Sequence, residues 1–486
     1  MKKLNITLLS IIIVSVLNVF SQDEIDAFRY SQLTPTGTAR FSSLAGSMGA
    51  FGADFSCLSS NPASIGVYKR SEFTFSPALY YSKATSFYNN TDAYDFKYNF
   101  NVGNLGAVFV IPYKKNWYIQ FGTGFNRMNN YHNRYIIKGP NTGVRANTTT
   151  SMTDYFSLLA NGIADSNLTG IGDWAYQTWL IDPYASTKPN QYVSHISGVN
   201  LEQRKVIQTT GSANEYVFSS GANYKDMLYI GATVGFPFFS YTQSSTYFER
   251  LADPNDTSTK FKSFHVDETF SSEATGVNFK LGILYQPVKF MRFGFACHTP
   301  TFYNTIRERY TSHYETEGYD KKYTSNGKFD YSLTTPLRVI GDLAFIIKKH
   351  GFINLHYSFT DYSTMQMHSR YYDFKNENEN IRNYFQAVHT LGIGAEVNLT
   401  PVAIRLGYAY NTNPYKSAVL MDGSYHLITG GLGIRTNHFF ADFAYMHKLY
   451  YNKSVFYNTI YNTKNNNLID HIIVNQHFIF TFGFKI

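Results

Sequence analysis

The 486-residue chain contains only two cysteines, Cys57 and Cys297, too few for a disulfide scaffold or a cysteine-based zinc module. Charged residues make up only 16% of it. The net charge of +8 comes from scattered basic residues rather than from a basic cluster, so nucleic acid is not an expected partner. An apolar fraction of 44% is ample for an ordered fold.

Beyond residue 21 the chain has no apolar run near the ~20 residues that a membrane-spanning helix needs. Residues 1–21 differ: Lys2 and Lys3 precede an apolar stretch that ends shortly before Ser21. This pattern predicts a secretory signal peptide, with the mature chain starting at Gln22. An N-terminal membrane anchor is the alternative.

Aromatic residues are abundant, with 41 Phe, 41 Tyr and 3 Trp. Amphipathic rings at this density suit a surface that meets both lipid and water. Many segments alternate large apolar residues with small or polar ones; examples are 228–236, 277–285, 291–297, 337–347, 353–359, 391–397, 402–410 and 478–486. A period of two predicts β-strands with one apolar face.

Six short polar turns, near residues 113–116, 223–226, 286–289, 348–351, 398–401 and 435–437, alternate with longer polar segments. The longer segments are 85–102, 132–201, 250–261, 316–324, 364–384, 414–422 and 455–469. Together they separate about 14 strands and predict an all-β, transmembrane antiparallel barrel of the Gram-negative outer membrane, residues 71–486, with both chain ends periplasmic. A secreted β-sandwich or propeller is the alternative.

Residues 22–70 break the alternation and are rich in small residues, and Pro62 rules out a central strand there. We expect this segment to fill the barrel lumen. It resembles the N-terminal hatch (plug) of FadL/TodX-type outer-membrane transporters of long-chain fatty acids and other hydrophobic compounds. The hatch motif that carries the resemblance comprises Gly46, Met48, Gly49, Asp54, Asn61, Pro62 and Ala63.

The resemblance implies a passive transporter. Extracellular loops capture a hydrophobic small molecule, which enters the lumen and leaves sideways, through hatch movement and a kink in the third strand. Segment 132–201 matches the capture loop by position, with Phe156, Leu159, Trp174 and Trp179 as candidate contacts; a self-packed cap over the barrel mouth is the alternative. Gly122 and Gly124 are the candidates for the kink, unless they make room for the hatch.

Several ionisable residues fall on the expected inward face, among them Arg292, Arg338 and Arg405. Buried charges need partners, so a network holding Asp54 and neighbouring hatch groups is one interpretation. The other is that Arg338, nearer mid-barrel, attracts a ligand carboxylate. Cys297 falls on the lipid-facing register, so a disulfide to Cys57 is not expected.

The sequence has no nucleophile elbow, zincin motif or calcium loop, so we expect no catalytic residues, no bound metal and no cofactor. The expected partners are the bilayer, lipopolysaccharide and the barrel-insertion machinery. Two alternatives to transport remain: a FadL-like barrel that docks a surface or secretion protein, and a haem or other hydrophobic-ligand receptor.

Overall fold

The computed structural model describes residues 24–114, 117–141, 151–185, 188–194, 196, 199–257, 260–317, 322–417, 419, 421–454 and 469–486. The expected signal peptide, residues 1–21, lies outside the described residues. So does nearly all of the expected loop 455–469.

The helical elements are short. They are α1 (Glu24–Ser31), α2 (Ala39–Ser43), η1 (Phe55–Ser59), η2 (Pro62–Val67), α3 (Met152–Ala160), η3 (Asp165–Asn167), α4 (Gly170–Gln177), η4 (Tyr362–Thr364) and α5 (Lys375–Tyr384). In the described part of the chain, no helix is long and apolar enough to cross a membrane.

Strands dominate the rest of the chain. They are β1 (Glu72–Tyr88), β2 (Thr91–Lys114), β3 (Trp117–Asn130), β4 (Asn133–Pro140), β5 (Ile181–Ala185), β6 (Lys188–Ser194), β7 (Leu201–Tyr224), β8 (Leu228–Leu251), β9 (Ser263–Val288), β10 (Met291–His298), β11 (Phe302–Glu317), β12 (Lys322–Thr334), β13 (Arg338–Ile347), β14 (Gly351–Asp361), β15 (Gln366–His368), β16 (Ala387–Leu399), β17 (Val402–Asn411), β18 (Tyr425–Arg435), β19 (Phe439–Ser454) and β20 (Ile469–Lys485).

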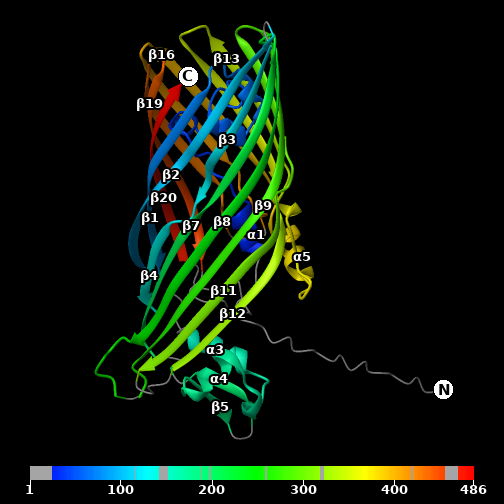
Figure 1. The fold of residues 1–486 in the computed structure, drawn as a ribbon. Helices are drawn as coiled ribbons and strands as arrows, with labels where there is room; N and C mark the ends of the chain where they lie inside the picture. The colour runs from blue at the N-terminus through cyan, green and yellow to red at the C-terminus, as the bar shows by residue number, and fades with distance from the viewer. Residues whose placement is uncertain are drawn as a thin grey trace, which may run out of the picture.

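All strands except β5 and β6 belong to one antiparallel sheet. In four places two consecutive segments continue one barrel strand: β3 with β4, β10 with β11, β12 with β13, and β14 with β15. The first and last strands pair, Phe73 opposite Phe484, which closes the sheet. The result is a closed 14-stranded barrel (Figure 1), as the alternation and turns predicted.

The six predicted short turns all connect neighbouring strands at one end of the barrel. The predicted loop 85–102 is wrong, because β1 and β2 run through it as a hairpin that turns at Asn89 and Asn90. Both asparagines have a left-handed backbone, with φ of 44° and 61°, which this residue type tolerates. The predicted loop 132–201 also contains strands: β4, which continues the barrel, and the short pair β5 and β6.

The outward face of the barrel is apolar. On β20, for example, Phe480, Phe482 and Phe484 are 46%, 46% and 51% exposed, while Thr481 between them is buried. A closed barrel leaves no unpaired edge in lipid, and an apolar belt of this kind matches a bilayer. The barrel therefore spans a membrane, with its polar and small side chains turned inward.

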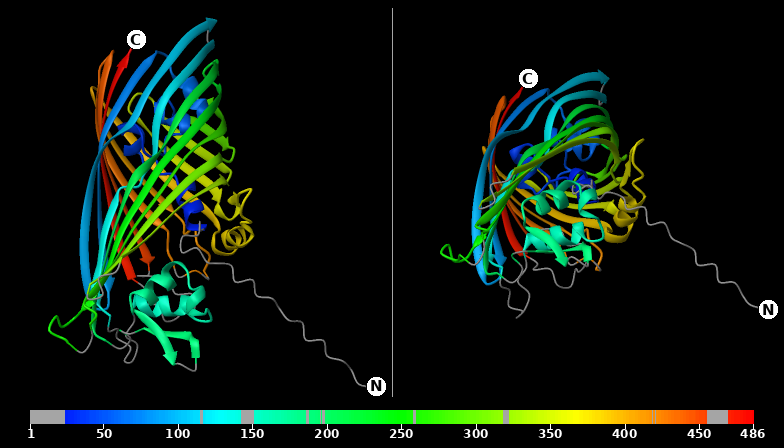
Figure 2. Two further views of the ribbon diagram at one scale, coloured as in Figure 1. Left: turned by 60° about the horizontal axis from the view of Figure 1, so that its bottom comes forward. Right: turned by 90° about the horizontal axis from the view of Figure 1, so that it is seen from below.

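Residues 24–70, called the hatch from here on, lie inside the barrel. Figure 2, seen from below, shows this dark blue segment enclosed by the strands. The α2–η2 part lies at the short-turn end, where Ile486 N donates to Ser71 O at 3.0 Å, so the C-terminus is at that end. α1 lies farther along the lumen and packs on α5. At the opposite end, α3, α4, β5 and β6 form a separate unit, the cap (Figure 1).

Candidate functional site

The hatch folds as short turns, each capped by its own polar side chain. Thr38 Oγ1 accepts from Phe41 N at 3.2 Å to start α2, and Asp54 Oδ1 accepts from Ser56 N at 2.9 Å to start η1. Asn61 Oδ1 accepts from Ala63 N at 3.2 Å to start η2, whose first residue is Pro62. Asp, Asn and Thr are favoured caps, and proline suits a first turn, so Asp54 and the Asn-Pro-Ala motif define the two 3-10 helices.

The Asn-Pro-Ala motif sits against glycines of three adjacent barrel strands. A Cβ on Gly282 of β9 would lie 2.1 Å from Asn61 Oδ1, and one on Gly231 of β8 would lie 2.4 Å from Pro62 O. Gly294 of β10 lies close to Asn61 in the same way. Because these glycines have no side chain, the barrel wall leaves room at this place for the Asn-Pro-Ala motif.

The earlier part of the motif packs equally closely. A Cβ on Gly49 would lie 2.2 Å from Asp342 Oδ2, and Gly46 has φ of +77°, where a side chain would be strained. Met48 is fully buried in a cluster with Leu44 and Cys57. These residues fix how the hatch backbone approaches the wall.

Glycines receive the hatch around much of the barrel. A Cβ on any of them would lie within 3.2 Å of a hatch atom: Gly103, Gly106, Gly122, Gly221, Gly231, Gly282, Gly294, Gly392, Gly394, Gly407 and Gly431. Sequence reasoning found the hatch but missed this lining. The sequence pattern that indicates this lining is glycine at the inward-facing positions of many strands.

The two glycines of β3 belong to this lining. A Cβ on Gly122 would lie 2.8 Å from Leu58 Cδ1, and one on Gly124 would lie 2.6 Å from Phe55 Cζ. At Gly122 and Gly124 the hydrogen-bond ladders from β3 to β2 and to β7 continue without a register shift. The register shift in the β3–β7 ladder falls between Arg127 and Asn129. Both glycines thus make room for the hatch, and the irregularity of the strand lies a few residues further on.

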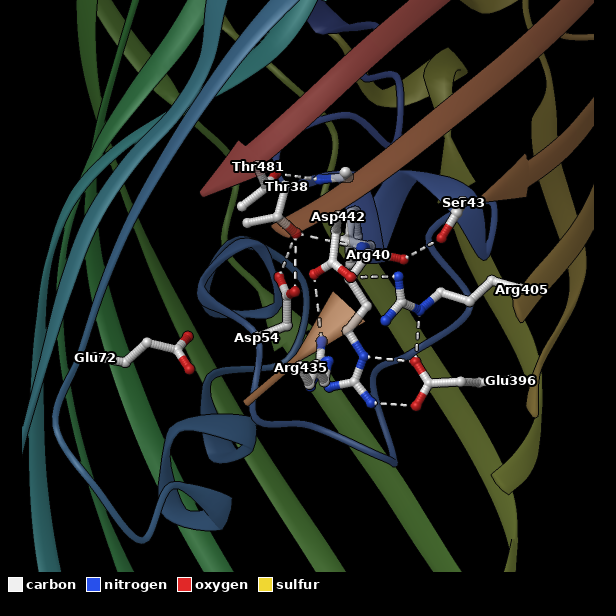
Figure 3. A network of polar contacts seen from close by, with 12 residues as sticks. Thr38, Arg40, Ser43, Asp54, Glu72, Glu396, Arg405, Arg435, Asp442 and Thr481 are labelled. Carbon is white, nitrogen blue, oxygen red and sulfur yellow. Dashed lines mark hydrogen bonds and ion pairs between the residues drawn. The ribbon is translucent and has the colours of Figure 1, made fainter. Parts of the chain in front are cut away.

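An ion network ties α2 to the wall (Figure 3). Arg40 donates from Nε and Nη2 to the two oxygens of Glu396 at 2.8 and 2.7 Å. Arg405 bridges Glu396 and Asp442 at 2.6 Å each, and Arg435 reaches Asp442 at 3.4 Å. The network contains Arg405, one of the three candidate arginines of the sequence analysis. It pairs three arginines with two carboxylates, which offsets the cost of burying them.

Asp54 lies beside the network and is held by Thr38, whose hydroxyl lies 2.7 and 2.8 Å from its two oxygens. Burial raises the pKa of Asp54 above its ordinary value, although Thr38 and Arg40 oppose this shift. Burial alone would lower the pKa of Arg40, but Glu396 outweighs it and raises that pKa. The hatch arginine is thus charged and paired.

The other two candidate arginines differ from Arg405. Arg292 donates to Phe51 O at 2.6 Å and to Gln286 Oε1 at 2.9 Å, so it holds the hatch backbone. Arg338 donates from Nε to Thr360 Oγ1 at 3.2 Å. Within the described residues, Arg338 forms no ion pair.

A cavity of about 110 Å³ lies in the lumen between α2 and α1. Phe28, Phe41, Met128 and Leu427 line it together with four basic side chains, His298, Arg338, His356 and Lys448, and among the described residues no carboxylate belongs to its lining. It is much larger than the ~10–15 Å³ that one water needs. Its chemistry suits a small apolar group next to an acceptor or an anion.

The barrel wall has a seam beside this cavity. β2 pairs with β3 only from Asn104 and Asn126 toward the short-turn end, and β4 pairs only with β7. Side chains bridge the rest: Asn130 Nδ2 donates to Asn99 Oδ1 at 3.1 Å, and Arg127 Nε donates to Val102 O at 3.2 Å. In this stretch of the described chain β2 keeps its ladder with β1, but no backbone ladder joins it to the β3–β4 strand. Met128, which lines the cavity, lies at the bulge next to the seam.

The cap is packed on itself and on the strand ends. Phe156 and Trp174 are buried in its core, Leu159 packs against that core, and Trp179 is 58% exposed. Glu249 of β8 anchors α3, because its two oxygens accept from Ser151 Oγ at 2.6 Å and Met152 N at 2.9 Å. Of the four candidate capture residues, only Trp179 presents most of its side chain to solvent.

The two thiols are free, and burial raises the pKa of Cys57 well above its ordinary value. A buried, protonated thiol is unreactive. Among the described residues, no three His, Cys, Asp or Glu side chains are placed to hold a metal ion.

No family model and no curated protein matches the sequence. Solved structures do match. A FadL homologue from Pseudomonas aeruginosa is 13% identical, with a TM-score of 0.56 over 93% of this chain and 99% of that one. The toluene transporter TodX of P. putida is 9% identical, with a TM-score of 0.55 over 94% and 99%. The resemblance predicted from the hatch motif therefore holds for the whole chain: this protein has the FadL-type fold.

Proposed function

We propose that the protein is an outer-membrane channel for the uptake of hydrophobic small molecules. The observation that carries the proposal is the lumen cavity beside the hatch. The hatch packs against the short-turn part of the barrel wall, so a molecule that enters from the cap end meets the hatch and, beside it, a cavity with both apolar and basic side chains. The matched structures include a toluene transporter, and that likeness supports a channel over a protein-docking barrel or a haem receptor.

The cavity favours a ligand that carries an acceptor or an anionic group on an apolar body. Arg338 faces it without a carboxylate partner in the described residues, and Lys448 lies 3.9 Å from the Tyr425 ring centroid at the same cavity. A guanidinium binds a carboxylate through strong hydrogen bonds. We therefore assign Arg338 the carboxylate of a fatty acid or similar amphiphile.

Release is assigned to the seam between β2 and the β3–β4 strand. A wall joined only by side chains opens at lower cost than a backbone ladder, and the outer face of β2 there is aromatic. A ligand in the cavity can pass Met128 and enter the bilayer without moving the whole hatch. The contacts that must separate include Asn130 to Asn99, Arg127 to Val102 O, and the Arg134–Asp95 ion pair.

The test is uptake by cells that lack the gene and carry either the wild type or the N99C/N130C variant. We expect the gene deletion to lower uptake of a radiolabelled long-chain fatty acid, and the wild type to restore it. An oxidised cross-link between the two new cysteines should block uptake until a reductant is added. Uptake that does not depend on the gene would contradict the channel proposal. Uptake that the cross-link leaves unchanged would contradict only the lateral release route. The two single-cysteine variants are the controls.

A further inference from the structure

A groove of about 780 Å³ lies on the outer wall, away from the lumen, where the tip of β2 meets β4, β7 and β8. Tyr94, Ile136 and Phe248 supply an apolar lining. Three cations, Lys138, Arg204 and Arg250, line it as well. Nothing in the proposed uptake route uses this site.

Two of the three cations occupy positions where their like charges destabilise the sheet. Lys138 and Arg204 lie directly opposite each other in the β4–β7 ladder, and both are exposed. Like charges at paired positions destabilise a sheet. In the described part of the chain neither side chain has an ion-pair or hydrogen-bond partner, whereas Arg250 donates from Nε to Glu202 at 2.7 Å. Asp92 and Glu202 are the two carboxylates of the groove, so its three cations leave it with a net positive charge.

The groove is continuous with the lipid-facing surface. The outer face of β2 carries two groups of large exposed residues, Ile111, Phe109 and Leu105 toward the short-turn end and Phe100, Phe96, Tyr98 and Tyr94 toward the other, with a bulge in the β1–β2 ladder between them. Tyr94, at 63% exposure, forms the rim of the groove. The stripe that these two groups form runs from the short-turn end to the end that carries the cap, so an acyl chain in the outer leaflet can lie along it.

We propose that this groove binds a phosphorylated glycolipid of the outer leaflet, with a phosphate between Lys138 and Arg204. A phosphate neutralises both cations and turns an unfavourable pair into a ligand site, because lysine and arginine form charge-assisted hydrogen bonds to phosphate oxygens. The apolar lining and the aromatic stripe favour a lipid over free phosphate as the ligand of this site.

The test counts glycolipid bound to the intact protein by native mass spectrometry, after reconstitution in zwitterionic nanodiscs that contain purified lipid A. We expect the K138E/R204E variant to bind about tenfold less than the wild type, and K138Q/R204Q to bind an intermediate amount. The control K289E/K349E makes the same charge change at exposed short-turn lysines and should bind normally.

Four results would overturn the proposal, and the first three concern the variants and the lipid. They are equal binding by K138E/R204E and the wild type, an equal loss in the control, and undiminished binding of dephosphorylated lipid A. Displacement of the glycolipid by millimolar inorganic phosphate would also overturn it, since the site would then recognise phosphate without the lipid. Heat-modifiability on gels shows that each variant is folded, and unchanged fatty-acid uptake separates this site from the channel.

Discussion

Arg40 of the hatch and Glu396 of β16 form a buried ion pair with two hydrogen bonds, although 356 residues separate them in the sequence. The same carboxylate accepts from Arg405 of β17. The hatch is therefore fastened to the wall by a charge contact as well as by close packing against glycines. Removing one partner of a buried pair leaves the other charge uncompensated.

The E396Q variant should loosen the hatch. Losing one partner of a buried pair costs about 3–5 kcal/mol, and here two arginines lose the negative charge that they share and one of its two acceptor oxygens. We expect larger and more frequent conductance openings in planar bilayers and faster trypsin cleavage within residues 24–70. E315Q breaks an exposed pair with Lys322 and should leave both unchanged. Equal behaviour of the two variants would contradict the anchoring role of Glu396.

The room that the wall glycines leave for the hatch is tested with two alanine substitutions in neighbouring parts of the wall. In G282A the new methyl group would lie 2.1 Å from Asn61 Oδ1, and overpacking of this kind costs about 1–3 kcal/mol. In G341A it meets nothing within 4 Å. We expect G282A to lower the temperature at which the barrel unfolds on gels and to raise conductance, while G341A resembles the wild type. If G282A unfolds and conducts like the wild type, Asn61 is able to shift away from the new methyl group.

Hatch docking should depend on pH through Asp54. The pKa of this carboxyl is raised in the docked hatch, so docking is strongest below its ordinary pKa of 3.8 and weakens as pH rises through the raised value. D54N carries no charge and should remove that decline. The measurement is conductance from acid to neutral pH for the wild type and for D54N. The difference between the two curves isolates the titration of Asp54 from that of Glu72, Asp442 and Glu396. A difference that does not change with pH would refute it.

Arg338 should discriminate between ligands by their head group. A hydrogen bond to a charged partner contributes about 1.5–3 kcal/mol, so R338L should lower uptake of a fatty acid about tenfold or more. Uptake of the alkane of the same length should change little. R309L, at an exposed position of β11, is the matched control. An equal loss for acid and alkane would mean that Arg338 supports the wall rather than the ligand.

Much of the barrel could be predicted because its signal is local. Alternation along β8 or β20 reveals a strand without knowledge of its neighbours, and the hatch motif is contiguous in sequence. The loop predicted at 85–102 was wrong because Asp95, Lys97 and Asn99 resemble loop residues unless their alternation with Phe96 and Tyr98 is given weight.

The site itself was less predictable, because it depends on long-range register. The partners of Arg40 and Arg405, the glycines beneath Asn61 and the seam at Asn99 are set by which residues meet across the barrel. Sequence reasoning placed Arg405 and Arg338 on the inward face. It could not determine that one is ion-paired and the other is not.

The most direct test of the channel is to fill the lumen cavity. Leu427 is buried in its lining, whereas Leu406, on the neighbouring strand β17, is 67% exposed to lipid. We would measure the initial rate of fatty-acid uptake by cells carrying L427W or L406W at equal levels of folded barrel. The account predicts a severalfold loss for L427W alone. Uptake by L427W at the wild-type rate would show that the ligand does not pass through this cavity.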